Sequence, residues 1–143
     1  FNTAHSGERA VYTVSRSRRN GIDIEYTRRK IEFEPIAKRF FAQAEYQELM
    51  QRPLPQRRRR FFDFWTCKEA VIKATGRGLA QGLDRFAVSF KGGDGPRIGS
   101  AASSALCRLQ LYATSTAGGY TIALSAMPPR MPPGRGRKKM PAR

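Results

Sequence analysis

Residues 61–79 read FFDFWTCKEAVIKATGRGL, in which four aromatic side chains lead into a helical pattern of apolar residues. Gly76 and Gly78 predict the C-terminal end of that helix, because glycine readily adopts the left-handed conformation that ends many helices. Glu69 and Lys73 are four positions apart and therefore share one face of the helix. Two interpretations are open: a surface ion pair worth about 0.3–0.5 kcal/mol, or part of a chemical site that includes further acids.

The chain has 143 residues, of which 40% are hydrophobic, and this suits one domain with a single modest core. It contains no apolar run of about 18 residues, so we expect no membrane-spanning helix. The first residues also lack the pattern of a signal peptide. Two cysteines, Cys67 and Cys107, have no neighbouring zinc ligands, which indicates free thiols in a cytoplasmic protein.

Basic residues dominate the charge, with 27 Lys and Arg against 11 Asp and Glu and a net charge of +16. Such a protein is expected to meet an anionic partner: nucleic acid, an anionic membrane surface, a phosphate-rich cofactor or an acidic protein. An arginine run at residues 57–60 lies at the start of the long helix, where the helix dipole favours acids. It is interpreted as a solvated basic face or as a docking contact for a partner.

We expect strands at residues 9–15, 22–26, 86–90, 106–114 and 120–126, and helices at residues 35–41, 44–50 and 56–75. The first two strands, joined by a turn at Asn20-Gly21, are predicted to pair in antiparallel fashion. The predicted fold is α+β, a mostly antiparallel sheet packed against one long helix and shorter helices. Residues 1–126 form the predicted domain, and residues 127–143, rich in Pro, Gly, Arg and Lys, a disordered basic tail.

Three acids are candidates for chemistry: Asp23 and Glu25 on one face of a predicted strand, and Glu69 on the long helix. Carboxylates gathered in a basic protein repel one another unless a cation lies between them. Mg²⁺ fits this arrangement, because it takes few carboxylates and fills its other positions with water and phosphate oxygens. The alternative interpretation is that Asp23 and Glu25 form the solvent face of an edge strand.

Three segments carry a more specific pattern: FNTAHSG at residues 1–7, GIDIE at residues 21–25, and FWTCKEAVIKATGRGL at residues 64–79. In this order they resemble the 4′-phosphopantetheinyl transferase superfamily, most closely its larger, surfactin-synthetase-activating branch. The resemblance covers residues 1–126 and implies the fold of that family. It also implies that Asp23 and Glu69 bind Mg²⁺ against the pyrophosphate of coenzyme A, with Glu25 as a third ligand.

The resemblance implies further roles for basic residues. His5 falls at the position that contacts the 3′-phosphate of coenzyme A, the alternative being a hydrogen-bonded structural histidine. Lys73 matches the lysine that contacts the cofactor phosphates, and Lys68, which precedes the metal-binding acid as in the family, is expected to bind coenzyme A as well. In the implied reaction a serine of an apo acyl, peptidyl or aryl carrier protein attacks the β-phosphate, and Glu69 or a metal-bound water accepts the proton. Adenosine 3′,5′-bisphosphate is released, and the basic surface favours encounter with an acidic carrier protein.

The resemblance also sets expectations about completeness. Ala4 replaces a serine found in many members, and the chain starts near the second of the two similar halves of the larger branch. We therefore expect self-association or pairing with a missing N-terminal half, because a lone half would expose some of the aromatics at residues 61–65. Two alternatives to an active transferase stay open, an inactive fragment of one and a basic nucleic-acid-binding protein.

Overall fold

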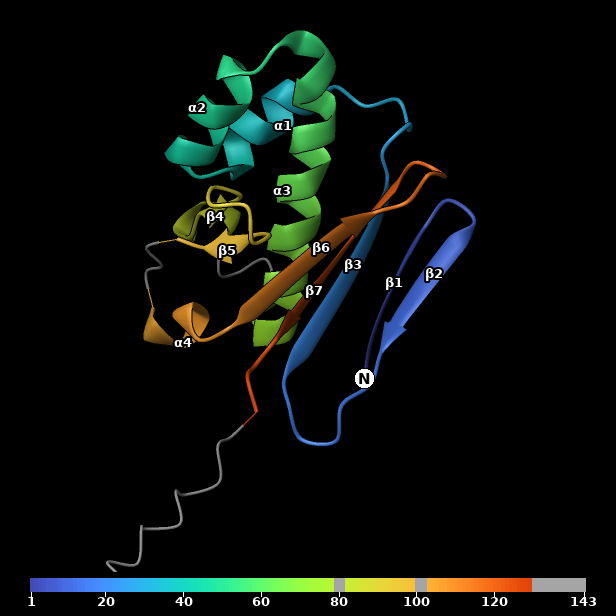
Figure 1. Ribbon diagram of the computed structural model, residues 1–143, viewed down its shortest axis with the longest axis vertical. Helices are drawn as coiled ribbons and strands as arrows, with labels where there is room; N and C mark the ends of the chain where they lie inside the picture. The colour runs from blue at the N-terminus through green and yellow to red at the C-terminus, as the bar shows by residue number, and fades with distance from the viewer. Residues whose placement is uncertain (79–81, 100–102, 130–143) are drawn as a thin grey trace, which may run out of the picture.

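The structure is a computed structural model and describes residues 1–78, 82–99 and 103–129. The elements are β1 (Asn2–Ser6), β2 (Arg9–Thr13), β3 (Asn20–Tyr26), α1 (Phe33–Phe40), α2 (Gln43–Gln51), α3 (Leu54–Thr75), the 3₁₀ turn η2 (Leu83–Arg85), β4 (Val88–Ser89), β5 (Arg97–Ile98), α4 (Ser104–Cys107), β6 (Gln110–Ser115) and β7 (Tyr120–Ala126) (Figure 1). Within the described ranges no helix is long and apolar enough to cross a membrane.

The centre of the fold is an antiparallel sheet with the strand order β3–β7–β6. The long helix α3 packs across one face of this sheet, and α1 and α2 pack around the first half of α3 (Figure 1). A left-handed Gly76 ends α3, as predicted, and a turn at Gly118-Gly119 joins β6 to β7. The predicted α+β class, with a mostly antiparallel sheet on one long helix and shorter helices, is confirmed.

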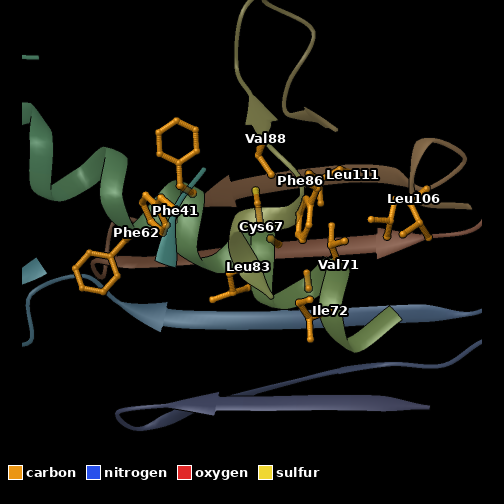
Figure 2. Close-up of a cluster of buried hydrophobic side chains, with 14 of the residues drawn as sticks. Phe41, Phe62, Cys67, Val71, Ile72, Leu83, Phe86, Val88, Leu106 and Leu111 are labelled. Carbon is orange, nitrogen blue, oxygen red and sulfur yellow. The ribbon is translucent and has the colours of Figure 1, made fainter. Parts of the chain in front are cut away.

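Aromatic side chains of α3 form the middle of the hydrophobic core (Figure 2). Phe61, Phe62 and Phe64 are 0–1% exposed, and Phe61 stacks on Phe41 with ring centroids 5.3 Å apart. The expectation that the single half would leave part of this aromatic stretch exposed is therefore wrong for these three phenylalanines, because the shorter helices and the 86–90 segment cover them. Among the described residues, the large apolar side chains that are exposed lie elsewhere, at Phe1, Tyr12, Val14, Leu54 and Tyr112.

The predicted pairing of the first two strands is wrong. β2 pairs with β1, a strand that the sequence analysis did not predict, and β3 pairs with β7. β1 lies along the free edge of β3 (Figure 1), where the side chains of Asn2 and Ser6 accept hydrogen bonds from the Ile22 and Tyr26 amides at 3.0 and 2.9 Å. The side-chain oxygens of β1 therefore accept hydrogen bonds from amides at the edge of β3, which the main chain of a paired strand would otherwise accept.

The last third of the chain differs in detail from the prediction. The expected strand at residues 106–114 begins with the short helix α4 and becomes strand only at Gln110, and the loop before it contains β5. The predicted tail begins directly after β7, which ends at Ala126. Residues 127–129 are neither helix nor strand, and residues 130–143 lie outside the described residues.

The arginine run at the start of α3 holds neighbouring segments together. Arg57 donates to the carbonyls of Met50 and Arg52 at the C-terminal end of α2, at 2.8 and 2.9 Å. Arg59 and Arg60 form ion pairs with Asp63. These contacts satisfy much of the charge internally, so the run is neither a purely solvated face nor a set of free docking contacts.

Candidate active site

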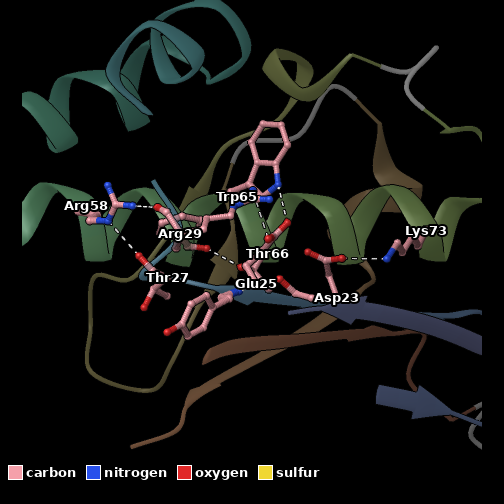
Figure 3. Close-up of polar contacts among 11 residues, drawn as sticks. Asp23, Glu25, Thr27, Arg29, Arg58, Trp65, Thr66 and Lys73 are labelled. Carbon is pink, nitrogen blue, oxygen red and sulfur yellow. Dashed lines mark hydrogen bonds and ion pairs between the residues drawn. The ribbon is translucent and has the colours of Figure 1, made fainter. Parts of the chain in front are cut away.

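The acidic side of β3 faces α3, which is the arrangement that the candidate site requires. Trp65, Glu69 and Lys73 follow one another at four-residue spacing along α3 and therefore share one side of the helix. Asp23 lies opposite Lys73, and Glu25 lies opposite Trp65 (Figure 3). Asp23 is only 6% exposed. The interpretation of Asp23 and Glu25 as the solvent face of an edge strand is therefore wrong for Asp23.

Gly21 explains why strand and helix come so close. A Cβ atom at this position would overlap the Ala70 carbonyl oxygen and the Ala74 amide nitrogen of α3. Only glycine lacks that atom, so β3 can lie directly against the helix backbone at Gly21. The close approach brings the Asp23 carboxylate within reach of Lys73.

Asp23 and Lys73 form the tightest contact of the site. The Lys73 ammonium donates to Asp23 Oδ1 at 2.8 Å and to the Ile22 carbonyl at 3.1 Å. Asp23 Oδ2 is buried and has no hydrogen-bond partner among the described residues. Burial raises the pKa of Asp23 above its usual value, and Lys73 opposes that shift. An unpartnered carboxylate oxygen in a buried position is a suitable ligand for a cation.

Glu25 is held by two donors. Its Oε1 accepts a hydrogen bond from Trp65 Nε1 at 3.2 Å, and its Oε2 pairs with the Arg29 guanidinium at 3.2 Å (Figure 3). Burial raises the pKa of Glu25, Arg29 opposes the shift, and Asp23 adds to it. Both oxygens of Glu25 are therefore already engaged by groups of the chain itself.

Glu69 differs from the other two acids. It is half-buried and makes no hydrogen bond or ion pair with any side chain in the described ranges, so the interpretation of Glu69 and Lys73 as a surface ion pair is wrong. Burial raises the pKa of Glu69 most, and the charges of Asp23 and Glu25 raise it further. The carboxylate of Glu69 therefore lies in the field of two other acids.

The donor set fits a hard divalent cation in its chemistry but is not assembled around one point. Oxygen is the ligand type that Mg²⁺ prefers, and Asp23 Oδ2 and the Glu69 carboxylate are unengaged. However, no group of three or more His, Cys, Asp or Glu side chains within the described ranges is close enough together to hold an ion. Binding of a cation would thus require side-chain movement, most of all at Glu25.

Two predicted residues lie away from the acids. His5 is on the exposed face of β1, paired with Ala10 of β2, whereas Ala4 faces the core. Lys68 is 0% exposed, and its ammonium bonds Glu45 Oε1 at 2.8 Å and the Phe86 carbonyl at 2.5 Å. The predicted contact of Lys68 with coenzyme A does not fit this inaccessible position, since the residue links α3 to α2 and to the 86–88 segment.

Sequence reasoning missed Arg29, Arg58 and Glu45 as supports of the site. Arg29 lies four residues after Glu25, a spacing that could have suggested an ion pair, although the segment is not helical. Arg58 and Glu45 act across 23 to 43 residues of sequence, through contacts with backbone groups as well as side chains. No local pattern reports such contacts.

The sequence of this chain is similar to those of known proteins. The family model of the 4′-phosphopantetheinyl transferase superfamily matches residues 19–125. The 4′-phosphopantetheinyl transferase Sfp of Bacillus subtilis is 36% identical over 132 residues, which are 92% of this chain and 57% of that protein. The 4′-phosphopantetheinyl transferase HetI of Nostoc sp. is 47% identical over 81 residues, or 57% of this chain and 34% of that protein. This chain thus spans about a third to a little over half the length of these relatives.

Solved structures show the same fold. The holo-[acyl-carrier-protein] synthase of Thermotoga maritima superposes with a TM-score of 0.61 at 20% identity, covering 76% of this chain and 61% of that one. The holo-ACP-synthase of Plasmodium yoelii gives a TM-score of 0.54 at 14% identity, covering 78% of this chain and 97% of that one. The family match includes β3 and α3, which carry the acids described above. This chain belongs to the 4′-phosphopantetheinyl transferase superfamily.

Proposed function

We propose that this chain carries the acidic site of an enzyme that transfers the 4′-phosphopantetheine group of coenzyme A to a serine of an apo carrier protein. The observation that carries the proposal is the placement of Asp23 on β3 and Glu69 on α3, near enough for the charge of Asp23 to raise the pKa of Glu69, with Lys73 bonded to Asp23 at 2.8 Å. Relatives of the same superfamily are named for this activity.

Asp23 and Glu69 are the residues that would hold Mg²⁺, with Glu25 as a third ligand after a change of partner. Asp23 Oδ2 has no hydrogen-bond partner among the described residues, and the pKa of Glu69 is raised by burial and by the nearby charges of Asp23 and Glu25, although Lys73 opposes the shift. A bound Mg²⁺ would supply neutralisation of the charge on the pyrophosphate bridge of coenzyme A.

Lys73 and Glu69 have the proposed catalytic roles. Lys73 is 29% exposed, so its ammonium is able to reach phosphate oxygens while it remains next to Asp23. Glu69 accepts the proton of the attacking serine hydroxyl, a role open to it because its carboxylate makes no hydrogen bond or ion pair with a described side chain. The phosphopantetheine arm becomes bonded to the serine oxygen, and adenosine 3′,5′-bisphosphate leaves. His5, exposed on β1, is the proposed contact for the 3′-phosphate.

The carrier protein is proposed to be acidic, because the chain has a net charge of +16. A second partner is proposed for the β1–β2 hairpin, where Phe1, Tyr12 and Val14 are 92%, 72% and 81% exposed. Apolar side chains exposed together favour self-association or pairing with another half of the enzyme. The free thiols Cys67 and Cys107 are consistent with a reducing compartment, and we propose that the reaction takes place in the cytoplasm.

One assay tests the proposal. The chain is incubated with coenzyme A, MgCl₂ and an apo carrier protein, and intact-mass spectrometry measures addition of phosphopantetheine to the carrier. We expect modification by the wild-type chain, loss of it with Asp23→Ala or Glu69→Ala, and no loss with Asp94→Ala, an exposed acid on a distant loop. Modification that appears only when a first-half polypeptide is added identifies a fragment. Salt-sensitive binding to DNA or RNA without any modification favours the nucleic-acid-binding alternative instead.

A further inference from the structure

The ion pair of Glu25 with Arg29 has a defined backbone geometry. A turn closed by the Arg29 amide and the Tyr26 carbonyl, 3.4 Å apart, follows directly after β3. This turn returns the Arg29 side chain to Glu25, where the two charged groups meet at 3.2 Å. The guanidinium of Arg29 also lies over the Phe62 ring, 5.6 Å from its centroid. The pair is therefore supported by the helix as well as by the strand.

Arg58 fixes the segment from which Arg29 extends. Its guanidinium donates to the carbonyls of Thr27, at 2.9 Å, and of Arg29 (Figure 3). It also donates to the Ile31 carbonyl. One side chain of α3 thus binds three alternate carbonyls of the segment between β3 and α1. Because the Arg29 carbonyl is one of these, the position of Arg29 is set by α3.

The two basic side chains of the site, Lys73 and Arg29, are not held equally firmly. Lys73 is 29% exposed and bonds the Ile22 carbonyl in addition to Asp23, whereas the side chain of Arg29 is 43% exposed. Loss of a bond to a charged partner costs less where water can replace that partner. When a divalent cation enters among Asp23, Glu25 and Glu69, Arg29 is therefore the resident cation that can leave at the lower cost.

We propose that Arg29 is a built-in counter-ion of Glu25 that competes with a divalent cation for this carboxylate, so that Arg29 lowers the affinity of the site for the metal. This inference rests on the proposed metal-binding role of Asp23, Glu25 and Glu69. The new element is that Glu25 exchanges its partner Arg29 for the metal. In this role Arg29 is a positioning residue, because it acts through Glu25.

Trp65 provides a readout that does not depend on enzymatic activity. It is the one tryptophan of the sequence, and its indole N–H donates to Glu25 Oε1 at 3.2 Å. Movement of the Glu25 carboxylate towards a cation changes that hydrogen bond. The fluorescence of the full chain is therefore measured during titration with MgCl₂, and calorimetry on the same samples gives the dissociation constant.

Four proteins are compared: the wild type, Arg29→Ala, Glu25→Gln and the double variant. Arg28→Ala is the matched control, because it removes an exposed arginine next to Arg29 that forms no ion pair with any described residue. We expect Arg29→Ala to bind Mg²⁺ about two- to five-fold more tightly than Arg28→Ala, the range for a partly exposed ion pair. The Trp65 response should move to correspondingly lower Mg²⁺ concentration. In the Glu25→Gln background, Arg29→Ala should have no effect.

Weaker Mg²⁺ binding by Arg29→Ala, or equal binding by Arg29→Ala and Arg28→Ala, overturns the role of Arg29. An equal effect of Arg29→Ala on Mg²⁺ affinity with and without Glu25→Gln also overturns this role. The arginine would then act through the overall charge of the protein and not through Glu25. These results leave the transferase proposal intact if wild type binds Mg²⁺ and Asp23→Ala does not. Absence of any Mg²⁺ response in the wild type and in Arg29→Ala counts against the metal site itself and against the inference together.

Discussion

The buried pair of Lys68 and Glu45 gives a stability prediction whose magnitude follows from the structure. Both side chains are essentially inaccessible, at 0% and 1% exposed, and their charged atoms are 2.8 Å apart. Glu45 also accepts hydrogen bonds from the Val88 and Ala42 amides, at 2.7 and 2.8 Å. Burial raises the pKa of Glu45, and Lys68 is the main group that opposes the shift. Lys68→Met should therefore leave a buried carboxylate without its counter-charge.

We expect Lys68→Met to cost about 3–5 kcal/mol of unfolding free energy, the usual cost of breaking one side of a buried ion pair. This is a large share of the roughly 5–15 kcal/mol typical of a domain. Glu45→Gln in the same chain should recover part of the loss, because glutamine is neutral and still accepts an amide hydrogen bond. Urea unfolding followed by Trp65 fluorescence measures the unfolding free energies of the wild type, of Lys68→Met and of the double variant.

The ion pair of Arg97 with Asp94 is the matched control. Its atoms are 2.7 Å apart, nearly the same distance as in the buried pair, but its side chains are 62% and 76% exposed. Arg97→Ala should therefore cost no more than about 1 kcal/mol. A similar small cost for Lys68→Met, or no recovery on adding Glu45→Gln, would refute the reasoning. A Lys68→Met variant of normal stability that no longer binds coenzyme A would support instead the role implied by the family resemblance.

Three further changes test other contacts. Gly21→Ala should destabilise the fold by about 1–3 kcal/mol, because the added methyl group meets the backbone of α3. The same change should weaken the response of Trp65 fluorescence to Mg²⁺. An unchanged urea midpoint would contradict this prediction. Arg58→Lys removes most of the contacts with the carbonyls of residues 27–31, so we expect faster amide hydrogen exchange in residues 27–32. Unchanged exchange would show that this segment keeps its conformation without Arg58. Burial raises the pKa of Asp63 more than Arg59 and Arg60 lower it, so ionisation of this group costs stability as the pH rises through its folded pKa, above 3.8. Asp63→Asn should therefore lose less stability than the wild type as the pH rises above about 4, measured by the urea midpoint at successive pH values, and equal losses would contradict the assignment.

The sequence predicted those parts of the fold that depend on local pattern. The apolar period of residues 56–75 and the glycine after Thr75 were sufficient for α3, and the alternation of residues 22–26 was sufficient for β3. The pairing of β3 could not be predicted this way, because β7 and the β1 edge both offer partners to its backbone. Residues 1–7 are short and polar, so their strand is recognisable only when it lies against β3.

The candidate site was predictable in its acids and less so in its cations. Asp23, Glu25 and Glu69 follow from strand alternation and the helical period, because those rules state which side chains share a face. Lys73 shares a helix face with Glu69 but bonds Asp23, since the strand approaches the helix at Gly21. Lys68, adjacent in sequence to Glu69, points into the core and bonds Glu45. Burial and long-range pairing decide these outcomes, and neither is encoded in the spacing of charges.

The alternation of residues 21–26 serves both the fold and the site. Gly21, Asp23 and Glu25 face the helix, whereas Ile24 and Tyr26 pack against the β1–β2 hairpin and Tyr120. A shift of one residue in the register of β3 would place isoleucine against Lys73 and bury the acids under the hairpin. It would also bring a side chain to the point where only glycine fits. The contact that forces glycine at position 21 therefore also selects the register in which the two acids reach Lys73 and Trp65.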